Sequence, residues 1–69
     1  MITIHGINEL VRKYGLEIPK EYWKDIEEYI EKKEKIVEKF GENYQKFQLA
    51  YAKGLLFMLK NGGNGNEKQ

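Results

Sequence analysis

The chain has 69 residues and no cysteine, so it has room for one domain and excludes a disulfide framework or a thiolate metal site. Its 12 Lys and Arg against 11 Asp and Glu give a formal net charge of +1, which argues against a protein dedicated to nucleic acid or to a membrane surface. No apolar run approaches the ~18 residues that a membrane span needs, and the N-terminal segment lacks the basic and apolar regions of a secretory signal. We therefore expect a cytoplasmic protein that does not contact a membrane.

One short helix is predicted near the N-terminus, over about residues 8–14. From Ile7 onward the apolar residues recur at i, i+3, i+4 and i+7, which is the spacing of one helix face. Asn8 can cap the start of this helix, and Gly15 can take the left-handed conformation that ends it. The preceding Met1–Ile4 is rich in β-branched residues, and it could form a strand only if another chain paired with it.

The longest regular segment is 20–40, which has a helical rhythm and contains neither Gly nor Pro. Its apolar residues gather on one arc and its charged residues on the other, while Pro19 suits a first helical position, so we expect a helix over 19–40. Most helical stability in proteins comes from the burial of an apolar face, and this helix therefore needs a partner. Gly41 can end it, and the chain should then fold back into a second long helix over 42–60.

These elements predict an all-α fold. The short N-terminal helix should pack on a long antiparallel αα-hairpin, giving a three-helix bundle within a single domain over 1–61. The C-terminal segment 62–69 has many Gly and Asn residues and no apolar residue, so we expect a disordered, flexible tail. Residues equally far from Gly41 should meet across the hairpin, and the more apolar flank, which carries Trp23 and Leu56, should receive the first helix.

Between Leu55 and Leu59 the last helix is apolar nearly all round. We expect its buried seam to consist of Tyr44, Phe47, Tyr51, Leu55, Met58 and Leu59. Lysines that recur every seven residues follow the outside of the same helix, with apolar residues between them, and the short first helix should not cover all of this surface. The predicted contact surface for a partner or a second copy, which we call the lysine strip, comprises Lys46, Leu49, Lys53, Leu56, Phe57 and Lys60. In the alternative, the termini and the connector at 16–18 fold over it.

An acidic strip follows the outer side of the long helix and is formed by Glu27, Glu31, Glu34 and Glu38. Its charge is opposite to that of the lysine strip, so the two strips could pair between copies of the chain. Exposed ion pairs are worth only ~0 to 1 kcal/mol, and a solvated charged face is the alternative.

Two polar residues interrupt the predicted core. Lys33 falls near the middle of the apolar arc of the long helix, Gln48 lies on the apolar side of the last helix, and the count from Gly41 places them almost opposite each other. Because a buried ammonium without a partner is costly, we expect the Gln48 carbonyl, and the hydroxyls of Tyr29 and Tyr51, to receive it. We interpret Lys33 and Gln48 as a buried polar pair that fixes the register of the hairpin. The alternatives are a lysine that reaches the edge of the bundle and a catalytic lysine.

Nothing in the sequence indicates an enzyme. Serine and cysteine are both absent, so the usual nucleophiles of a catalytic triad are missing. The single histidine, His5, has no acidic or hydroxyl partner at a recognisable spacing, and no motif indicates a metal, a cofactor or a small-molecule substrate. We therefore expect a small non-enzymatic interaction or regulatory module that presents helix faces to a protein partner or to a second copy, as a homodimer.

The alternative function is that of a small nucleic-acid-binding regulator of the kind that viruses and plasmids carry. It would use the lysine strip or a second basic edge, formed by Arg12, Lys13, Lys32, Lys35 and Lys39. The bias toward Lys, Glu, Ile and Tyr resembles the composition of hyperthermophile proteins, although an AT-rich genome gives similar usage.

Overall fold

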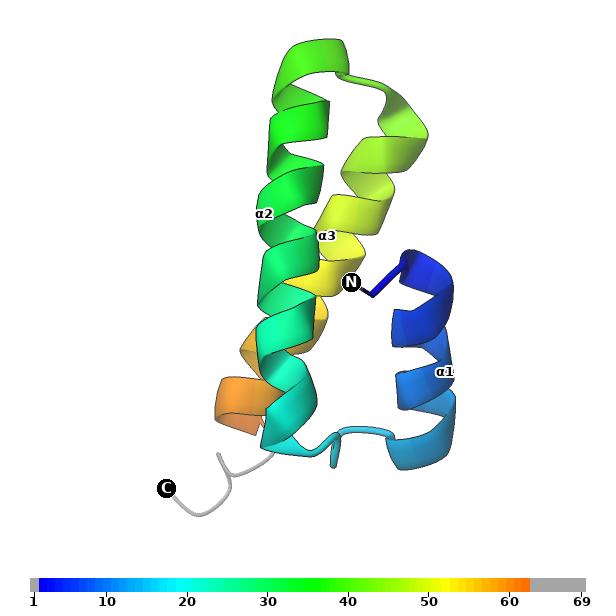
Figure 1. The fold of residues 1–69 in the computed structure, drawn as a ribbon, viewed down its shortest axis with the longest axis vertical. Helices are drawn as coiled ribbons and strands as arrows, with labels where there is room; N and C mark the ends of the chain where they lie inside the picture. Colours follow the sequence, from blue (N-terminus) through cyan, green and yellow to red (C-terminus); the bar gives the residue numbers. More distant parts are fainter. Residues whose placement is uncertain (1, 63–69) are drawn as a thin grey trace.

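The computed structural model describes residues 2–62, and every regular element in this part of the chain is helical (Figure 1). The elements in chain order are α1 (Ile4–Tyr14), a 3-10 turn (Lys20–Tyr22), α2 (Trp23–Phe40), α3 (Asn43–Phe57) and a π-helical turn (Met58–Gly62). α2 and α3 run antiparallel, and α1 lies beside them. The predicted all-α fold of three helices is confirmed, while the predicted tail lies outside the described residues from position 63 onward.

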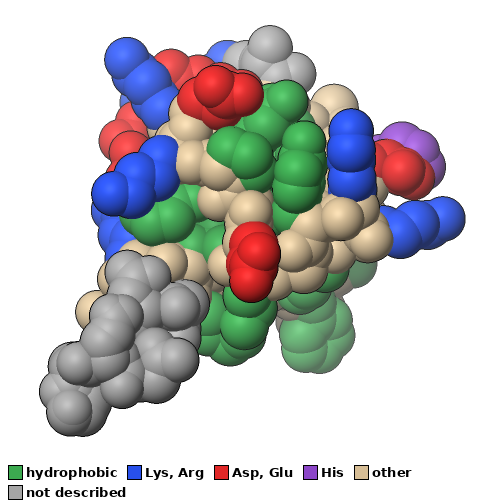
Figure 2. All heavy atoms as spheres, turned by 90° about the horizontal axis from the view of Figure 1, so that it is seen from below, with side chains coloured by type: hydrophobic (Ala, Val, Ile, Leu, Met, Phe, Trp, Pro, Cys, Tyr) green, Lys and Arg blue, Asp and Glu red, His purple; other side chains and the backbone are tan. Residues whose placement is uncertain are grey.

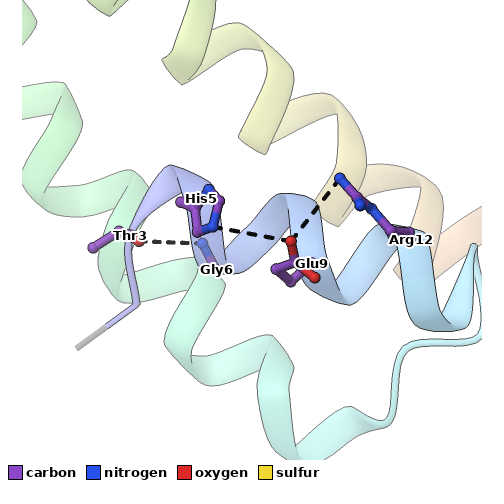
Figure 3. Close-up of polar contacts among 5 residues, drawn as sticks. All are labelled: Thr3, His5, Gly6, Glu9 and Arg12. Carbon is purple, nitrogen blue, oxygen red and sulfur yellow. Dashed lines mark hydrogen bonds and ion pairs between the residues drawn. The ribbon is translucent and has the colours of Figure 1, made fainter.

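α1 begins earlier than the sequence pattern predicted. The Thr3 hydroxyl oxygen accepts a hydrogen bond from the Gly6 backbone N–H at 3.1 Å, so Thr3 and not Asn8 is the N-cap (Figure 3). Residues 2–4, which the sequence allowed as part of a strand, therefore lead into a helix. Thr and Asn are both good N-cap residues, and the earlier start is favoured because the added turn packs Ile4 against the core.

The link between α1 and α2 is fixed at both of its ends. α1 ends as predicted, since Gly15 has a φ of 65° and its N–H donates to the Val11 carbonyl at 2.8 Å. Ile18 is buried in the core, and its carbonyl accepts a hydrogen bond from the Trp23 indole N–H at 3.0 Å. The predicted helix start at residue 19 is wrong, because Pro19 is extended with a ψ of 146° and α2 begins only after the 3-10 turn.

Gly41 makes the turn between α2 and α3. Its φ of 70° is left-handed, a conformation that glycine adopts at little cost, and α2 ends directly before it as predicted. The buried hydrophobic cluster of the described residues consists of Ile7, Ile18, Ile26, Tyr29, Ile30, Ala52, Leu55 and Leu59. Ile26 and Ile30 of α2 thus share one core with Ala52 and Leu55 of α3.

The buried side of α3 differs from the predicted seam. Ala52, Leu55 and Leu59 reach the core. The remaining members of the predicted seam are exposed, namely Tyr44, Phe47, Tyr51 and Met58. The apolar residues of α3 occur around most of the helix, so its rhythm does not select one face. The small Ala52 side chain lets the two backbones approach closely, which a line of tyrosine and phenylalanine side chains would prevent.

α1 lies on the flank of the hairpin that is opposite to the predicted one. Ile4 and Asn8 of α1 line one hollow together with Phe47, Gln48 and Tyr51 of α3. The predicted placement of α1 against Leu56 is therefore wrong. The flank that carries Leu56 instead bears two ion pairs between α2 and α3 beside an open groove.

Candidate protein-interaction surface

The lysine strip lies along one side of α3, on the flank that α1 does not cover. Its members recur at intervals of three or four residues, so they share a helix face. Four of them border a shallow groove of about 290 Å³ between α2 and α3, whose lining is Ile30, Lys53, Leu56, Phe57, Lys60 and Asn61. The structure thus brings together Lys53, Leu56, Phe57 and Lys60 around one depression.

Apolar surface of the lysine strip remains in water. Phe57 is 66% exposed, while Leu49 and Leu56 are half-buried and pack against the core. Lys46 is exposed, lies nearer the Gly41 turn and does not line the groove. An exposed aromatic beside an apolar groove is a common anchor of protein interfaces.

Two of the three lysines of the lysine strip form ion pairs within the chain. Lys60 Nζ lies 2.7 Å from Glu27 Oε2, and Lys53 Nζ lies 3.4 Å from Glu34 Oε2. Both glutamates belong to the predicted acidic strip, which the antiparallel hairpin places beside the lysines of the same copy. All four side chains are about half-exposed, and each pair contributes at most ~1 kcal/mol to stability.

Lys33 and Gln48 meet across the hairpin. Lys33 Nζ donates hydrogen bonds to Gln48 Oε1 at 3.0 Å and to Gln45 Oε1 at 2.6 Å. The prediction that this pair is buried is wrong, because both side chains are only half-buried and Lys33 borders a hollow that opens to solvent. Two amide oxygens thus stabilise the ammonium at the edge of the hairpin. The role of Lys33 and Gln48 in fixing the register stays a prediction.

The tyrosine hydroxyls do not receive the Lys33 ammonium, contrary to expectation. Lys33 Nζ lies 5.2 Å from the centre of the Tyr29 ring, so it contacts the aromatic face instead. The Tyr29 hydroxyl is buried without a hydrogen-bond partner among the described residues, and this desolvation raises the pKa of Tyr29. Gln45 was not predicted as a partner of Lys33, although it lies one helical turn before Gln48 on the same side of α3.

A second uncovered surface lies between the start of α1 and the Gly41 turn (Figure 1). One hollow there has a volume of about 320 Å³ and is lined by Ile2, Thr3, Ile4, Tyr29, Lys32, Lys33 and Ile36. A second hollow, of about 290 Å³, is lined by Ile4, Asn8, Phe47, Gln48 and Tyr51. Because the predicted seam had placed Phe47 inside the bundle, this surface was not foreseen. The short length of the first helix was the signal for it.

The end of the molecule opposite the Gly41 turn also carries apolar side chains. Figure 2 views this end and shows hydrophobic side chains gathered there, with charged side chains around them. Leu16 in the link is 44% exposed. Apolar exposure is therefore not confined to the two flanks of the hairpin.

The polar residues of α1 form local ion pairs (Figure 3). Glu9 Oε2 lies 3.9 Å from both His5 Nε2 and Arg12 Nη2, and all three side chains are exposed. The pairing of His5 with Glu9 was not predicted, because the predicted first helix began only at about residue 8. Residues four apart are neighbours only within a helix. Within residues 2–62, no group of three or more His, Cys, Asp or Glu side chains could hold a metal ion.

No protein-family model, no curated protein and no solved structure matches this chain. None of the helices in the described part of the chain is long and apolar enough to cross a membrane. The proposals below therefore rest on the geometry of the described residues.

Proposed function

We propose that this protein is a small, non-enzymatic cytoplasmic module with a regulatory role, which presents helix faces to a protein partner and forms a homodimer through the lysine strip. The groove between Ile30 and Leu56 carries the proposal, because α1 leaves it open and Phe57 stands exposed beside it. Apolar surface in water is unfavourable, and contact with another protein removes it from water.

A second copy fits the lysine strip because the strip offers both an apolar groove and an exposed aromatic side chain. A two-fold axis lets Phe57 of each copy enter the groove of the other, as in an isologous interface. The ion pairs with Glu27 and Glu34 neutralise Lys53 and Lys60, so two such faces approach without strong repulsion.

Light scattering tests the homodimer. At a protein concentration on the order of 100 μM we expect a dimer for the wild type and a monomer for Phe57→Glu, because a buried carboxylate without a partner is costly. Phe47→Glu is the matched control, because it makes the same substitution at another exposed phenylalanine, on the opposite flank of the hairpin. Circular dichroism should show the same helix content in all three proteins. A monomeric wild type, or a dimer that Phe57→Glu leaves intact, would contradict the homodimer.

Nucleic-acid binding is the alternative that a second assay separates. Several basic residues are already paired within the chain, including Arg12 with Glu9 and Lys60 with Glu27, which disfavours contact with phosphates. In a gel shift with duplex DNA and with RNA, we expect no binding at low salt. Binding that weakens steeply between about 50 and 200 mM salt would instead favour the nucleic-acid regulator.

A further inference from the structure

The part of the hairpin near Gly41 carries an uncovered surface on the α1 flank. We call it the tip face, and it comprises Lys32, Lys33, Ile36, Phe40, Tyr44 and Phe47. α1 has 11 residues and α2 has 18, so α1 is only ~16 Å long beside ~27 Å of α2. α1 starts near the middle of the hairpin and runs away from the Gly41 turn (Figure 1). No helix of the described chain therefore lies over the tip face.

The aromatic residues of the tip face are largely in water. The exposed fraction is 66% for Phe40, 58% for Tyr44 and 75% for Phe47. Since one aromatic side chain can bury 150 to 250 Å², these fractions leave on the order of 400 Å² of apolar surface. That is the size of the largest apolar patches on monomeric proteins, and about half of the ~800 Å² that each partner gives to a standard interface.

The charged side chains that line the tip face are positive. Lys32 and Lys33 line the hollow of about 320 Å³, which lies at the start of α1. Neither of the two hollows on this flank is lined by an acidic residue. Lys33 is held by the neutral amides of Gln45 and Gln48. This arrangement differs from the lysine strip, whose groove-lining lysines have glutamate partners. The ammonium of Lys33 therefore has hydrogen-bond acceptors but no counter-ion within the described residues.

The start of α1 makes the same hollow suited to an anion. The N-terminal end of α1, with Thr3 and Ile4, borders the hollow and has no acidic residue in its first turn, so the positive end of the helix dipole is not neutralised locally. Tyr29 also lines the hollow, and because its hydroxyl is buried it contributes apolar lining. Positive charge and apolar surface thus occur together.

We infer that the tip face binds an acidic amphipathic helix of a partner protein. Such a helix, lying across the tip face in line with α1, would place apolar side chains at i, i+3 or i+4, and i+7 on Ile36, Phe40 and Phe47. A glutamate or aspartate one turn away would then pair with Lys33. The tip face is separate from the lysine strip, so this inference does not rest on the proposed homodimer.

The positive charges of the tip face favour an acidic partner protein over a second copy of this chain. A tip face of a second copy has no acidic residue among the residues that line its hollows, so it offers no counter-charge to Lys32 and Lys33. Residues 63–69 of the same chain contain no apolar side chain, so they do not match the aromatic surface.

A pair of synthetic peptides tests this inference. The probe is a fluorescein-labelled amphipathic peptide of about 15 residues, built from Leu, Ala and Glu, and its counterpart has Lys in place of every Glu. Fluorescence anisotropy at low salt should show binding of the acidic peptide and at least about tenfold weaker binding of the basic one. Phe47→Glu and Lys33→Met should each weaken the acidic peptide about tenfold. Lys35→Met, which removes an exposed lysine that lines neither hollow, and Phe57→Glu should leave its affinity within about twofold.

Four results would overturn the inference. The first is no binding of the acidic peptide at a protein concentration on the order of 1 mM. The second is equal binding of the acidic and basic peptides, and the third is affinity that Phe57→Glu removes and Phe47→Glu does not. Loss of self-association in Phe47→Glu, measured by light scattering, would assign the tip face to a second copy and would also contradict the acidic partner. Phe47 is mostly exposed, so its replacement leaves the fold intact, and circular dichroism checks this.

Discussion

Ile26→Ala should remove about a third or more of the stability of this fold. Ile26 has no exposed surface and belongs to the cluster that joins residues of α1, α2 and α3. The change deletes three carbon atoms, and at ~0.8 kcal/mol for each buried carbon the lost transfer free energy is about 2.4 kcal/mol. The cavity left behind raises the cost to about 3 to 4 kcal/mol. At ~0.05 to 0.15 kcal/mol per residue, a chain of this length has a free energy of unfolding of only about 3 to 10 kcal/mol.

Urea unfolding at one fixed protein concentration, followed by circular dichroism, measures this loss. Phe47→Ala is the matched control, because it deletes a larger side chain that is 75% exposed and should cost less than about 0.5 kcal/mol. On hydrophobicity alone, the order of the two effects would be the reverse. A loss in Phe47→Ala that equals or exceeds the loss in Ile26→Ala would refute the assignment of the buried side of α3.

Three other substitutions each test the role of one side chain. Trp23→Phe removes the indole N–H that donates to the Ile18 carbonyl, so the free energy of unfolding, measured in urea, should fall by about 1 kcal/mol. An unchanged free energy of unfolding would argue against this hydrogen bond. Lys33→Met replaces a half-buried ammonium by an apolar side chain of similar length, so thermal unfolding should show equal or higher stability. A loss of more than about 1 kcal/mol would show that the fold depends on the hydrogen bonds of Lys33. Burial raises the pKa of Tyr29 above its usual value of 10.0, so the unfolded chain loses the phenol proton first. The resulting stability is fully present below about pH 10 and is lost as the pH rises through the raised pKa. Tyr29→Phe should reduce this alkaline loss in urea unfolding at a series of pH values, and an unchanged loss would exclude Tyr29 as its source.

The hairpin could be predicted from the sequence because several signals agree there. The arc of apolar residues on α2, the absence of Gly and Pro within it and the glycine at position 41 all indicate one helix and one turn. The count outward from Gly41 also places Lys33 opposite Gln48, as the structure has them, although it wrongly put Phe40 and Tyr44 in the core. Helical spacing alone places the members of the lysine strip on one side of α3.

The buried face of α3 and the position of α1 could not be predicted in the same way. Because apolar residues surround most of α3, large aromatic side chains were favoured over the small Ala52 that the close approach of the helices requires. The flank that α1 takes depends on how its apolar side chains pack against the core, which exists only once α2 and α3 have come together. The exposure of the tip face follows from both effects.

The central claim is that the chain doubles back at Gly41 so that α2 and α3 share their apolar sides, and nuclear Overhauser effects between methyl groups test it most directly. The structure predicts cross-peaks from the Ile26 and Ile30 methyls to those of Leu55 and Ala52. In one continuous helix, residues 26 and 55 would lie ~44 Å apart and no such cross-peak could form. Absence of these cross-peaks, with the helix content retained, would contradict the hairpin and both surfaces derived from it.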